Sequence, residues 1–361
     1  MNPFTRNPKP ETRNSSFLFP NPQSAIRNFS LAAALLLLCL FAPSNLQAQP
    51  DLGGVFRQSR LLMGTSAEIS VSRATPKKAE DALEAAFQEV ERINVLMSHY
   101  RPDSEVSRIT RFAGKREMRV SPETLEVIER SLYFSRLSEG AFDITIGPIF
   151  RLWNFREGKI PDDQSLRENL KRVDYRKVRV DRAASSVFLE DSGMELDLGA
   201  IAKGHAVDLA CAVLQKKGME GFLVKLGGEI KAHGEKGPGV PWIVGIQHPR
   251  LPSELLAKLK VRNAAIATSG DYEKFFLQGG ERYHHILNPS TGMPAQECQS
   301  VTILAPRSMD ADALATTVFV LGPRKGFSLI EKLPGVHAVI VDRRGSVLTS
   351  PGWPAGVLLP P

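Results

Sequence analysis

Cysteine is scarce in this sequence, and the few that occur exclude two classes of protein. Of the three cysteines, Cys39 lies in an N-terminal apolar stretch, so only Cys211 and Cys298 belong to the body of the chain. Two cysteines this far apart form neither the disulfide framework of a small secreted domain nor a zinc signature. Whether they pair with each other in an oxidising compartment stays open at this point.

Three familiar catalytic and nucleotide-binding motifs are missing as well. No nucleophile elbow is present, which argues against a serine hydrolase. The segments "GAIAKG" and "GEKGPG" lack the glycine spacing of a Walker A loop and of a dinucleotide-binding fingerprint. The sequence therefore does not predict a nucleotide site of either kind.

An apolar run long enough to span a membrane is also missing. The clearest candidate, "LAAALLLLCLFA" at 31–42, has twelve residues, whereas a spanning helix needs about 20. Small residues follow it, and four basic residues precede it: Arg6, Lys9, Arg13 and Arg27. Residues 1–49 are therefore predicted to be a signal peptide that exports the protein to the periplasm, with a retained anchor in the inner membrane as the alternative. Leu38 argues against lipidation of Cys39, because such sites usually have a small residue at that position.

The excess of positive charge is modest. The formal net charge is +7 at pH 7, and it falls to +4 once residues 1–49, with four basic residues and one acid, are removed. A charge of this size does not predict binding to nucleic acid.

The body of the chain shows helical and strand patterns without a repeat or a long linker. Apolar residues at three- and four-residue spacing predict helices that begin at Thr75-Pro76 and Ser121-Pro122, where each pair supplies an N-cap and an N1 proline. Further helices are expected at 202–217 and 310–322. The expected strands are "AEISVS", "KVRVD", "SVFLE", "FLVKLGG", "WIVGIQ", "KLKVRNAAIATSG", "SVTILAP" and "HAVIVDRRGSVLTS". Because helices and strands come in blocks, residues 50–361 are predicted to form one compact α+β domain with a largely antiparallel sheet and packed helices.

The densest candidate site is "MELDLGAIAKGHAVD" at 194–208. A strand that ends at Asp197 is expected to meet a Gly199-Ala200 turn that opens a helix, whose free amides and positive dipole end attract anions. Lys203 lies one turn into this helix, where it can meet a phosphate or a carboxylate. The alternative is an ordinary junction between strand and helix, with Asp197 as the cap and Lys203 in solvent.

Two further segments carry weaker signals. In "GGEI", 227–230, two glycines allow a ligand to approach the backbone closely, but a plain bulge or turn explains them equally well. In "ATSGDYEKFF", 267–276, a polar turn precedes Tyr272 and Phe275, which offer flat surfaces to a heteroaromatic ring. Packing in the core is the default role for both aromatic residues.

Asp312 and Thr316 stand four residues apart in "DADALATTVFVLG", so they share one face of the expected helix. A carboxylate and a hydroxyl together suit Mg²⁺, which prefers oxygen ligands and keeps several waters. The alternative is that Asp312 only stabilises the N-terminus of the helix.

Two adjacent histidines, His284 and His285, precede an Asn-Pro-Ser-Thr-Gly turn in "HHILNPSTG". Residue type alone leaves three roles open for them, namely catalysis, metal binding and a polar strand edge.

In order along the chain, these segments resemble the FAD:protein FMN transferase family of ApbE-type flavin transferases. The resemblance covers about residues 58–340 and rests on "RLLMGTSAEI", "MSHYRPDSEVSRI", "GAFDITIGPIFRLW", "DLGAIAKGHAVD", "LGGEI", "IATSGDYEKFF", "HHILNPSTGMPA" and "DADALATTVFVLG". It implies a tunnelling-fold-like α+β core.

The resemblance also implies a reaction. An Mg²⁺-dependent enzyme of this family cleaves the pyrophosphate of FAD, releases AMP and leaves FMN ester-linked to a threonine or serine of an exported acceptor protein. Family acceptors carry a motif of the type Asp-x-x-Ser/Thr-Gly-Ala-Ser/Thr and typically belong to membrane redox complexes. Phosphoryl transfer needs positioning and charge neutralisation more than covalent help from the protein.

By the same resemblance, the functional residues fall at specific positions. The metal would be held by the Ala200 carbonyl, Asp312 and Thr316. His285 would be the base that activates the acceptor hydroxyl, and His284 would have no catalytic role. The flavin-binding positions implied are Met63, Tyr100, Ala141, Phe142, Asp143, Asp197, Lys203 and Ile286.

Two other functions compete with the transferase. An Mg²⁺-dependent FAD pyrophosphatase, which gives FMN and AMP in water, would use the same site. A non-catalytic flavin-binding protein is disfavoured, because the expected base and metal ligands are all present.

Overall fold

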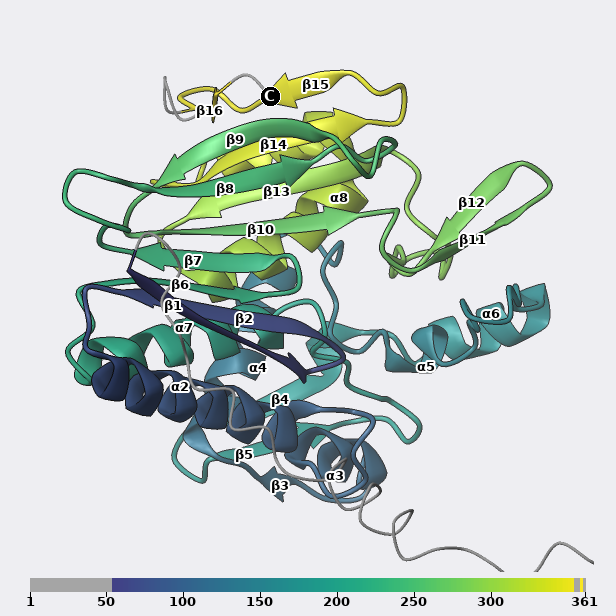
Figure 1. Ribbon diagram of the computed structural model, residues 1–361. Helices are drawn as coiled ribbons and strands as arrows, with labels where there is room; N and C mark the ends of the chain where they lie inside the picture. Colours follow the sequence, from purple (N-terminus) through teal and green to yellow (C-terminus); the bar gives the residue numbers. More distant parts are fainter. Residues whose placement is uncertain (1–53, 354–357, 360–361) are drawn as a thin grey trace, which may run out of the picture. The chain divides into compact units, whose positions relative to one another are not determined.

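An eight-stranded sheet forms the centre of the fold, and each pair of neighbouring strands in it is antiparallel (Figure 1). The strand order is β1-β2-β6-β7-β10-β13-β14-β15. The strands are β1 (Val55–Leu62), β2 (Thr65–Ser72), β6 (Gly221–Leu226), β7 (Glu229–His233), β10 (Ala264–Gly270), β13 (Cys298–Ala305), β14 (His337–Asp342) and β15 (Val347–Thr349). The predicted α+β class with a largely antiparallel sheet is therefore confirmed.

This computed structural model describes residues 54–353 and 358–359. They belong to one compact unit that begins at Ala48. The predicted signal peptide, residues 1–49, lies outside the described residues. Within the described part of the chain, no helix is both long enough and apolar enough to cross a membrane.

Three smaller sheets accompany the central one. They have two or three strands each, in the orders β16-β9-β8, β3-β5-β4 and β11-β12. The strands are β3 (Met118–Arg119), β4 (Val178–Asp181), β5 (Ser186–Leu189), β8 (Trp242–Gln247), β9 (Leu255–Val261), β11 (Phe275–Gln278), β12 (Glu281–His284) and β16 (Leu358–Leu359). Among the described strands, β8 pairs only with β9, so it lies at the edge of its sheet.

The helices begin close to the predicted positions. They are α2 (Pro76–Met97), α3 (Glu105–Arg111), α4 (Pro122–Leu137), α5 (Gly147–Phe150), α6 (Asp163–Leu170), the short 3₁₀ turn η1 (Tyr175–Lys177), α7 (Ala202–Lys216) and α8 (Ser308–Ile330). Ser121 caps α4 by accepting a hydrogen bond from the Thr124 amide, whereas the Thr75 side chain makes no such bond to α2. Thr75 is nevertheless the N-cap residue of α2 and Pro76 begins the helix, so the predicted start is confirmed, although only Ser121 caps its helix through the side chain.

Two other local predictions differ from the structure. Helix α8 begins before the predicted 310–322 range and continues past it, because the chain resumes helical geometry after Gly322 (φ +75°) and Pro323. The strand expected to end at Asp197 is absent, since the chain there forms only an isolated bridge between Glu195 and Ile146. The chain reaches α7 as a loop rather than from a sheet.

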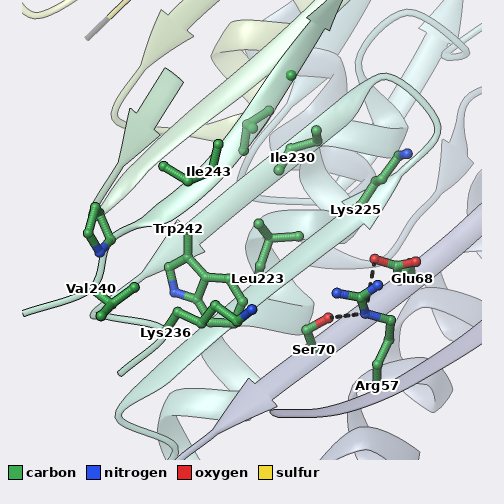
Figure 2. A pocket seen from close by; sticks show the side chains of 13 residues that line it. Arg57, Glu68, Ser70, Leu223, Lys225, Ile230, Lys236, Val240, Trp242 and Ile243 are labelled. Carbon is green, nitrogen blue, oxygen red and sulfur yellow. Dashed lines mark hydrogen bonds and ion pairs between the residues drawn. The ribbon is translucent and has the colours of Figure 1, made fainter. Parts of the chain in front are cut away.

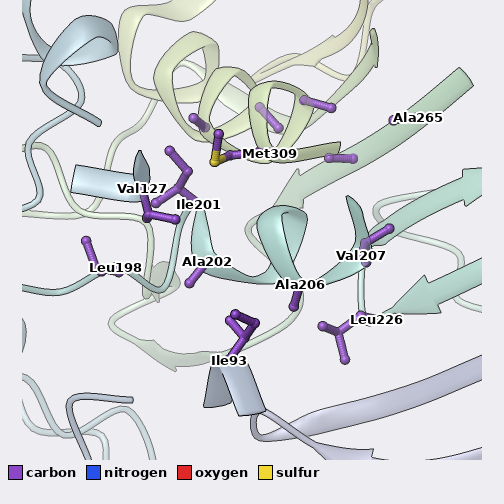
Figure 3. Packing of buried hydrophobic residues seen from close by; sticks show 14 of the residues in the cluster. Ile93, Val127, Leu198, Ile201, Ala202, Ala206, Val207, Leu226, Ala265 and Met309 are labelled. Atoms are coloured by element: carbon purple, nitrogen blue, oxygen red, sulfur yellow. The ribbon is translucent and has the colours of Figure 1, made fainter. Parts of the chain in front are cut away.

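The two faces of the central sheet have different partners because side chains alternate along each strand. On one face, residues such as Ala265 and Leu226 join the main core with α2, α7 and α8. In Figure 3 the small residues of α7, Ala202 and Ala206, lie between Ile93 of α2 and Met309 of α8. The opposite face packs against β8 and β9 in a second apolar cluster.

Candidate functional site

The N-terminal turn of α7 carries the first part of the site. Lys203 is the second residue of α7, and its Nζ donates a hydrogen bond of 2.8 Å to the Gly199 carbonyl. The same ammonium lies 3.4 Å from the Asp312 carboxylate and 3.2 Å from Glu229. Burial alone would lower the pKa of Lys203, but the charges of Asp312 and Glu229 raise it well above its usual value. Lys203 is therefore a fixed cation, not a solvent-exposed side chain.

Helix α8 brings the second part to the same place. Asp312 is 3% exposed, and its Oδ2 accepts a 2.9 Å hydrogen bond from the Gly204 amide. Thr316 lies one turn further along, with its hydroxyl 3.2 Å from the Ser269 hydroxyl of β10. The structure thus brings Lys203 of α7 next to the α8 turn that carries Asp312 and Thr316, which follow it by more than 100 residues in the sequence.

Glu229, the first residue of β7, belongs to this site and was missed by the sequence reasoning. Its Oε1 contacts Lys203, while its Oε2 is buried without a hydrogen-bond partner among the described residues. Burial, reinforced by the charge of Asp312, raises the pKa of Glu229 to about 8. The available signal was an acidic residue directly after the Gly227-Gly228 pair.

The paired glycines themselves serve strand packing. A Cβ on Gly228 would lie 2.7 Å from the Thr268 carbonyl oxygen of β10. The Thr268 amide donates a 3.2 Å hydrogen bond to the Gly228 carbonyl. The turn therefore lets β7 and β10 approach closely, and this places Glu229 next to α7.

The histidine pair lies at the end of the β11-β12 hairpin, and the two rings have different surroundings. His284 is buried; its Nε2 donates to the Ala295 carbonyl at 2.8 Å, and its Nδ1 accepts from the Ile286 amide at 3.3 Å. His285 is half-buried, and its Nδ1 has no partner among the described residues. Burial, followed by the charge of Lys274, lowers the pKa of His285 to about 3. Its imidazole is therefore held in the neutral form.

Aromatic stacking holds this hairpin in place. The rings of Phe276 and Tyr283 stack with centroids 5.2 Å apart, and Tyr283 lies 6.1 Å from Trp153. Trp153 also donates a hydrogen bond to the Gly292 carbonyl. The turn after His285 and the hairpin before it are both fixed to the segment that follows α5.

Ile286, expected at the flavin, is 6% exposed and packs in the main core.

A cavity of about 460 Å³ lies beside the loop that leads to α7. Its lining includes Tyr100, Asp197, Phe150 and Trp153. Tyr100 is 75% exposed and packs on His99, with ring centroids 3.9 Å apart. The volume and the aromatic walls suit a heteroaromatic ring.

Asp197 and His99 form a pair in this cavity. The His99 Nδ1 lies 3.3 Å from the Asp197 Oδ1, which also accepts a 2.7 Å hydrogen bond from the Gly199 amide. Burial opposes charge on both groups, but their interaction lowers the pKa of Asp197 and raises that of His99. Asp197 binds the turn before α7 without capping the helix. His99 was missed, although it stands next to Tyr100 in the sequence.

Two residues expected at the flavin direct their side chains into the protein. Phe142 is 3% exposed and packs against Phe134 in the main core. Asp143 accepts hydrogen bonds from the Thr145 amide and hydroxyl and from the Tyr175 amide, at 2.7 to 2.9 Å. Burial raises the pKa of Asp143. Both side chains stabilise the loop, and of the three adjacent residues expected at the flavin only Ala141 is partly exposed.

Met63 lies in the β1-β2 turn with φ +50°. This turn is next to the double glycine, because the Gly227 amide donates a 3.0 Å hydrogen bond to the Ser66 carbonyl. Met63 therefore lies at the same end of the central sheet as Glu229.

The oxygen atoms at the junction of α7 and α8 fit Mg²⁺. They comprise the Asp312 carboxylate, the Thr316 hydroxyl and the unpartnered Oε2 of Glu229, and Ala200 belongs to the turn that leads into α7. Mg²⁺ prefers such oxygen donors and needs few of them from the protein. Within residues 54–353, no group of three or more His, Cys, Asp or Glu side chains has the geometry of a metal centre.

Comparison with known proteins decides the family. A family model described as the ApbE family matches residues 63–340. The chain belongs to the ApbE family. The resemblance seen in the sequence is therefore confirmed.

Relatives of this ApbE-family chain are similar over most of their length. An FAD:protein FMN transferase of Treponema pallidum is 38% identical over 309 residues, which cover 80% of this chain and 85% of the relative. An FAD:protein FMN transferase of Vibrio cholerae is 34% identical over 329 residues, which cover 88% of this chain and 95% of the relative.

Solved structures agree with the fold. The crystal structure of the ApbE protein of Thermotoga maritima has a TM-score of 0.75 and 33% identity, and the flavin transferase ApbE of Vibrio cholerae has 0.74 and 31%. Each match covers 82% of this chain and 97% of the solved one.

Proposed function

We propose that this ApbE-family chain is an Mg²⁺-dependent FAD:protein FMN transferase, which moves FMN from FAD to a threonine or serine hydroxyl of an exported protein. The observation that carries the proposal is the convergence of Lys203, Asp312 and Glu229 at the N-terminal turn of α7. A buried lysine between two carboxylates, beside a helix N-terminus, suits a pyrophosphate and its counter-ion.

The chain's own residues have distinct roles in this reaction. The Lys203 ammonium and the amides of the α7 turn bind and orient the pyrophosphate. Tyr100 and Asp197 hold the flavin ring in the adjoining cavity. Asp312, Thr316 and the Ala200 carbonyl would hold Mg²⁺, which neutralises charge on the AMP side when bound.

His285 supplies the proton transfer. The acceptor hydroxyl oxygen bonds to the phosphorus of the FMN half, while the bond from that phosphorus to the bridging oxygen breaks. AMP leaves with the bridging oxygen, and His285 takes the hydroxyl proton. A neutral imidazole is required for this step, and burial keeps the His285 ring neutral in the free enzyme.

The location and the partner belong to the same proposal. The segment at 1–49 exports the chain to the periplasm, where it is soluble or held at the inner membrane. The acceptor is a protein with an Asp-x-x-Ser/Thr-Gly-Ala-Ser/Thr motif, of the kind found in membrane redox complexes. The relatives' name, FAD:protein FMN transferase, supports a protein acceptor for the FMN group.

One experiment separates transfer from hydrolysis of FAD. The enzyme is mixed with FAD, Mg²⁺ and a protein carrying the acceptor motif, and both the fluorescence of the acceptor in a gel and AMP release are followed. A fluorescent acceptor with equal AMP supports transfer. AMP and free FMN without labelling would show a pyrophosphatase instead.

We predict that Asp312→Ala lowers the rates of AMP release and of acceptor labelling at least about 100-fold, because it removes a charge at the proposed metal site.

His285→Asn should slow labelling of the acceptor far more than His284→Asn, which serves as the matched control. Equal losses of transfer in the two histidine variants, with both folded by circular dichroism, would contradict the assignment of His285 as the base.

A further inference from the structure

An apolar patch lies on the side of the molecule away from α7 and α8. Among the described residues, eleven large hydrophobic side chains are exposed, and four of them lie on β8, on β9 or in the loops next to these strands. The four are Val240, Ile243, Leu251 and Leu255. Such a concentration on one small sheet indicates a contact surface more than chance exposure does.

Lysines outnumber the acidic residues on this face, where Glu68 and Glu235 pair with Arg57 and Arg262. Residues of β9 alternate, so that Ala257 and Leu259 point inward while Lys258 and Lys260 point outward. Ile243 pairs with Lys260 across the strands, which mixes apolar and cationic side chains. Two further lysines, Lys225 of β6 and Lys236 before β8, line the adjoining groove.

A groove of about 430 Å³ runs beside the free edge of β8 (Figure 2). Leu223, Ile230 and Trp242 line its apolar floor, and Lys225 and Lys236 lie at its rim. The groove combines an apolar interior with cationic edges, which suits an amphipathic anion.

Chain length brings this face close to the predicted membrane segment. The apolar run ends at residue 42, and β1, which starts at Val55, contributes Arg57 to the groove. The intervening residues span at most about 40 Å when fully extended. A run at 31–42 that stays in the membrane would hold β1 within that distance of the lipid surface.

We propose that the β8-β9 face, defined as the four apolar residues and four lysines named above, is a contact surface for anionic phospholipids of a membrane. The apolar side chains enter the headgroup layer, and the lysines meet lipid phosphates. The inference rests on the proposed export of the chain. Because Lys203 and Asp312 lie on the other face of the central sheet, this orientation leaves the transfer site open to an acceptor.

The test uses residues 48–361, so that the N-terminal apolar run does not contribute. These residues form a compact unit, and crystal structures of relatives match it over 97% of their own length, so the part folds without residues 1–47. Vesicles of phosphatidylcholine, with or without about 30 mol% phosphatidylglycerol, are sedimented with the protein at low and high salt. Binding is expected only with phosphatidylglycerol, and salt should weaken it.

Substitutions on the β8-β9 face test whether its residues contact the vesicles. Lys258→Gln and Lys260→Gln together should lower the partition coefficient by about fivefold for each lysine. Ile243→Ser should lower it further. Lys325→Gln with Lys332→Gln, two exposed lysines at the end of α8, is the matched control and should bind as the parent does. Flavin binding, followed by fluorescence, confirms that each variant is folded.

Several outcomes would overturn the proposal. Equal binding to both vesicle types, or an equal loss in the α8 control, would show that the β8-β9 face is not the surface. Complete displacement by about 10 mM glycerol phosphate would indicate a small-anion site instead. Binding of a poly-glutamate peptide without vesicle binding would assign the edge of β8 to an acidic polypeptide. None of these results depends on FMN transfer, so the proposed function is tested separately.

Discussion

At the scale of single residues, the proposed site contains polar groups without a partner among the described residues. His284 uses both ring nitrogens in hydrogen bonds within the protein, whereas His285 leaves Nδ1 unpaired among the described residues. Adjacent residues of one type therefore differ in hydrogen bonding because of their surroundings. The same criterion identifies Glu229, whose second oxygen is buried and unpaired.

The pH dependence of the reaction tests the environment of His285. Since its pKa is lowered to about 3, the imidazole stays neutral in the free enzyme across the usual range of pH. We expect kcat/KM for FAD to show no acid limb near pH 6.5, where an ordinary histidine would give one. Lys274→Gln removes a nearby positive charge and should move the acid limb of the profile to higher pH. An unchanged profile in this variant would contradict the assignment.

His205 of α7 carries another buried imidazole, and this one affects the stability of the fold rather than the reaction. It is 1% exposed, and neither ring nitrogen has a partner among the described residues. Burial lowers its pKa below 6.5, so the unfolded chain binds the proton first as the pH falls. Stability that is present above pH 6.5 is therefore lost as the pH falls toward the folded-state pKa.

We predict that His205→Leu raises the free energy of unfolding by about 1 kcal/mol at pH 7 and by more at pH 5, because it removes an unpaired buried group. Urea denaturation at both pH values measures this. The matched variant His284→Leu should be destabilised by about 1–3 kcal/mol, since it leaves the Ala295 carbonyl and the Ile286 amide unpaired. A His205→Leu protein less stable than the parent at pH 5 would refute the interpretation.

At the scale of elements, the site depends on the close approach of α7 and α8. Gly204 makes this possible, because a Cβ at that position would lie 2.3 Å from the Ser308 carbonyl oxygen and 2.8 Å from the Asp312 Cβ. The Gly204 amide in turn holds Asp312. A glycine inside a helix is costly, and here the cost is offset by the position of the carboxylate.

We expect Gly204→Ala to displace the start of α8, with a loss of about 1–3 kcal/mol in the free energy of unfolding. The larger effect should be on Mg²⁺-dependent FAD binding, measured by flavin fluorescence, because Asp312 moves with the helix. The control is Ala212→Gly on the exposed side of α7, which costs about 1 kcal/mol in helix propensity. Equal Mg²⁺ affinity in the two variants would rule out this role for Gly204.

At the scale of the whole molecule, one sheet separates two surfaces. The helices on one face form the main core and the transfer site, and the β8-β9 sheet covers the other face.

The sequence left open whether Cys211 and Cys298 form a disulfide. Both are buried and free, on α7 and β13. Burial raises the pKa of the Cys298 thiol to about 12 and that of Cys211 even further.

The buried thiols predict a global readout. Dithiothreitol should leave the melting temperature of residues 48–361 unchanged, because no disulfide is present to reduce. A thiol reagent should detect neither cysteine in the native protein and both after denaturation. Fast labelling of either cysteine under native conditions would contradict their burial.

The sequence by itself determined the local and compositional features. Spacing placed Asp312 and Thr316 on one helix face, the Ser121-Pro122 pair started a helix, and block order favoured an antiparallel α+β fold. These features depend on neighbours within a few residues, so the chain alone specifies them. The ordered motifs also indicated the ApbE family, which the family match bears out.

Only the tertiary structure decided which of these residues meet. Glu229 joins Lys203 because the Gly227-Gly228 turn allows β7 and β10 to pack closely, and Phe142 turns into the core because Phe134 lies there. Long-range packing and burial set such contacts and the resulting pKa shifts, and neither is encoded in residue type or short spacing.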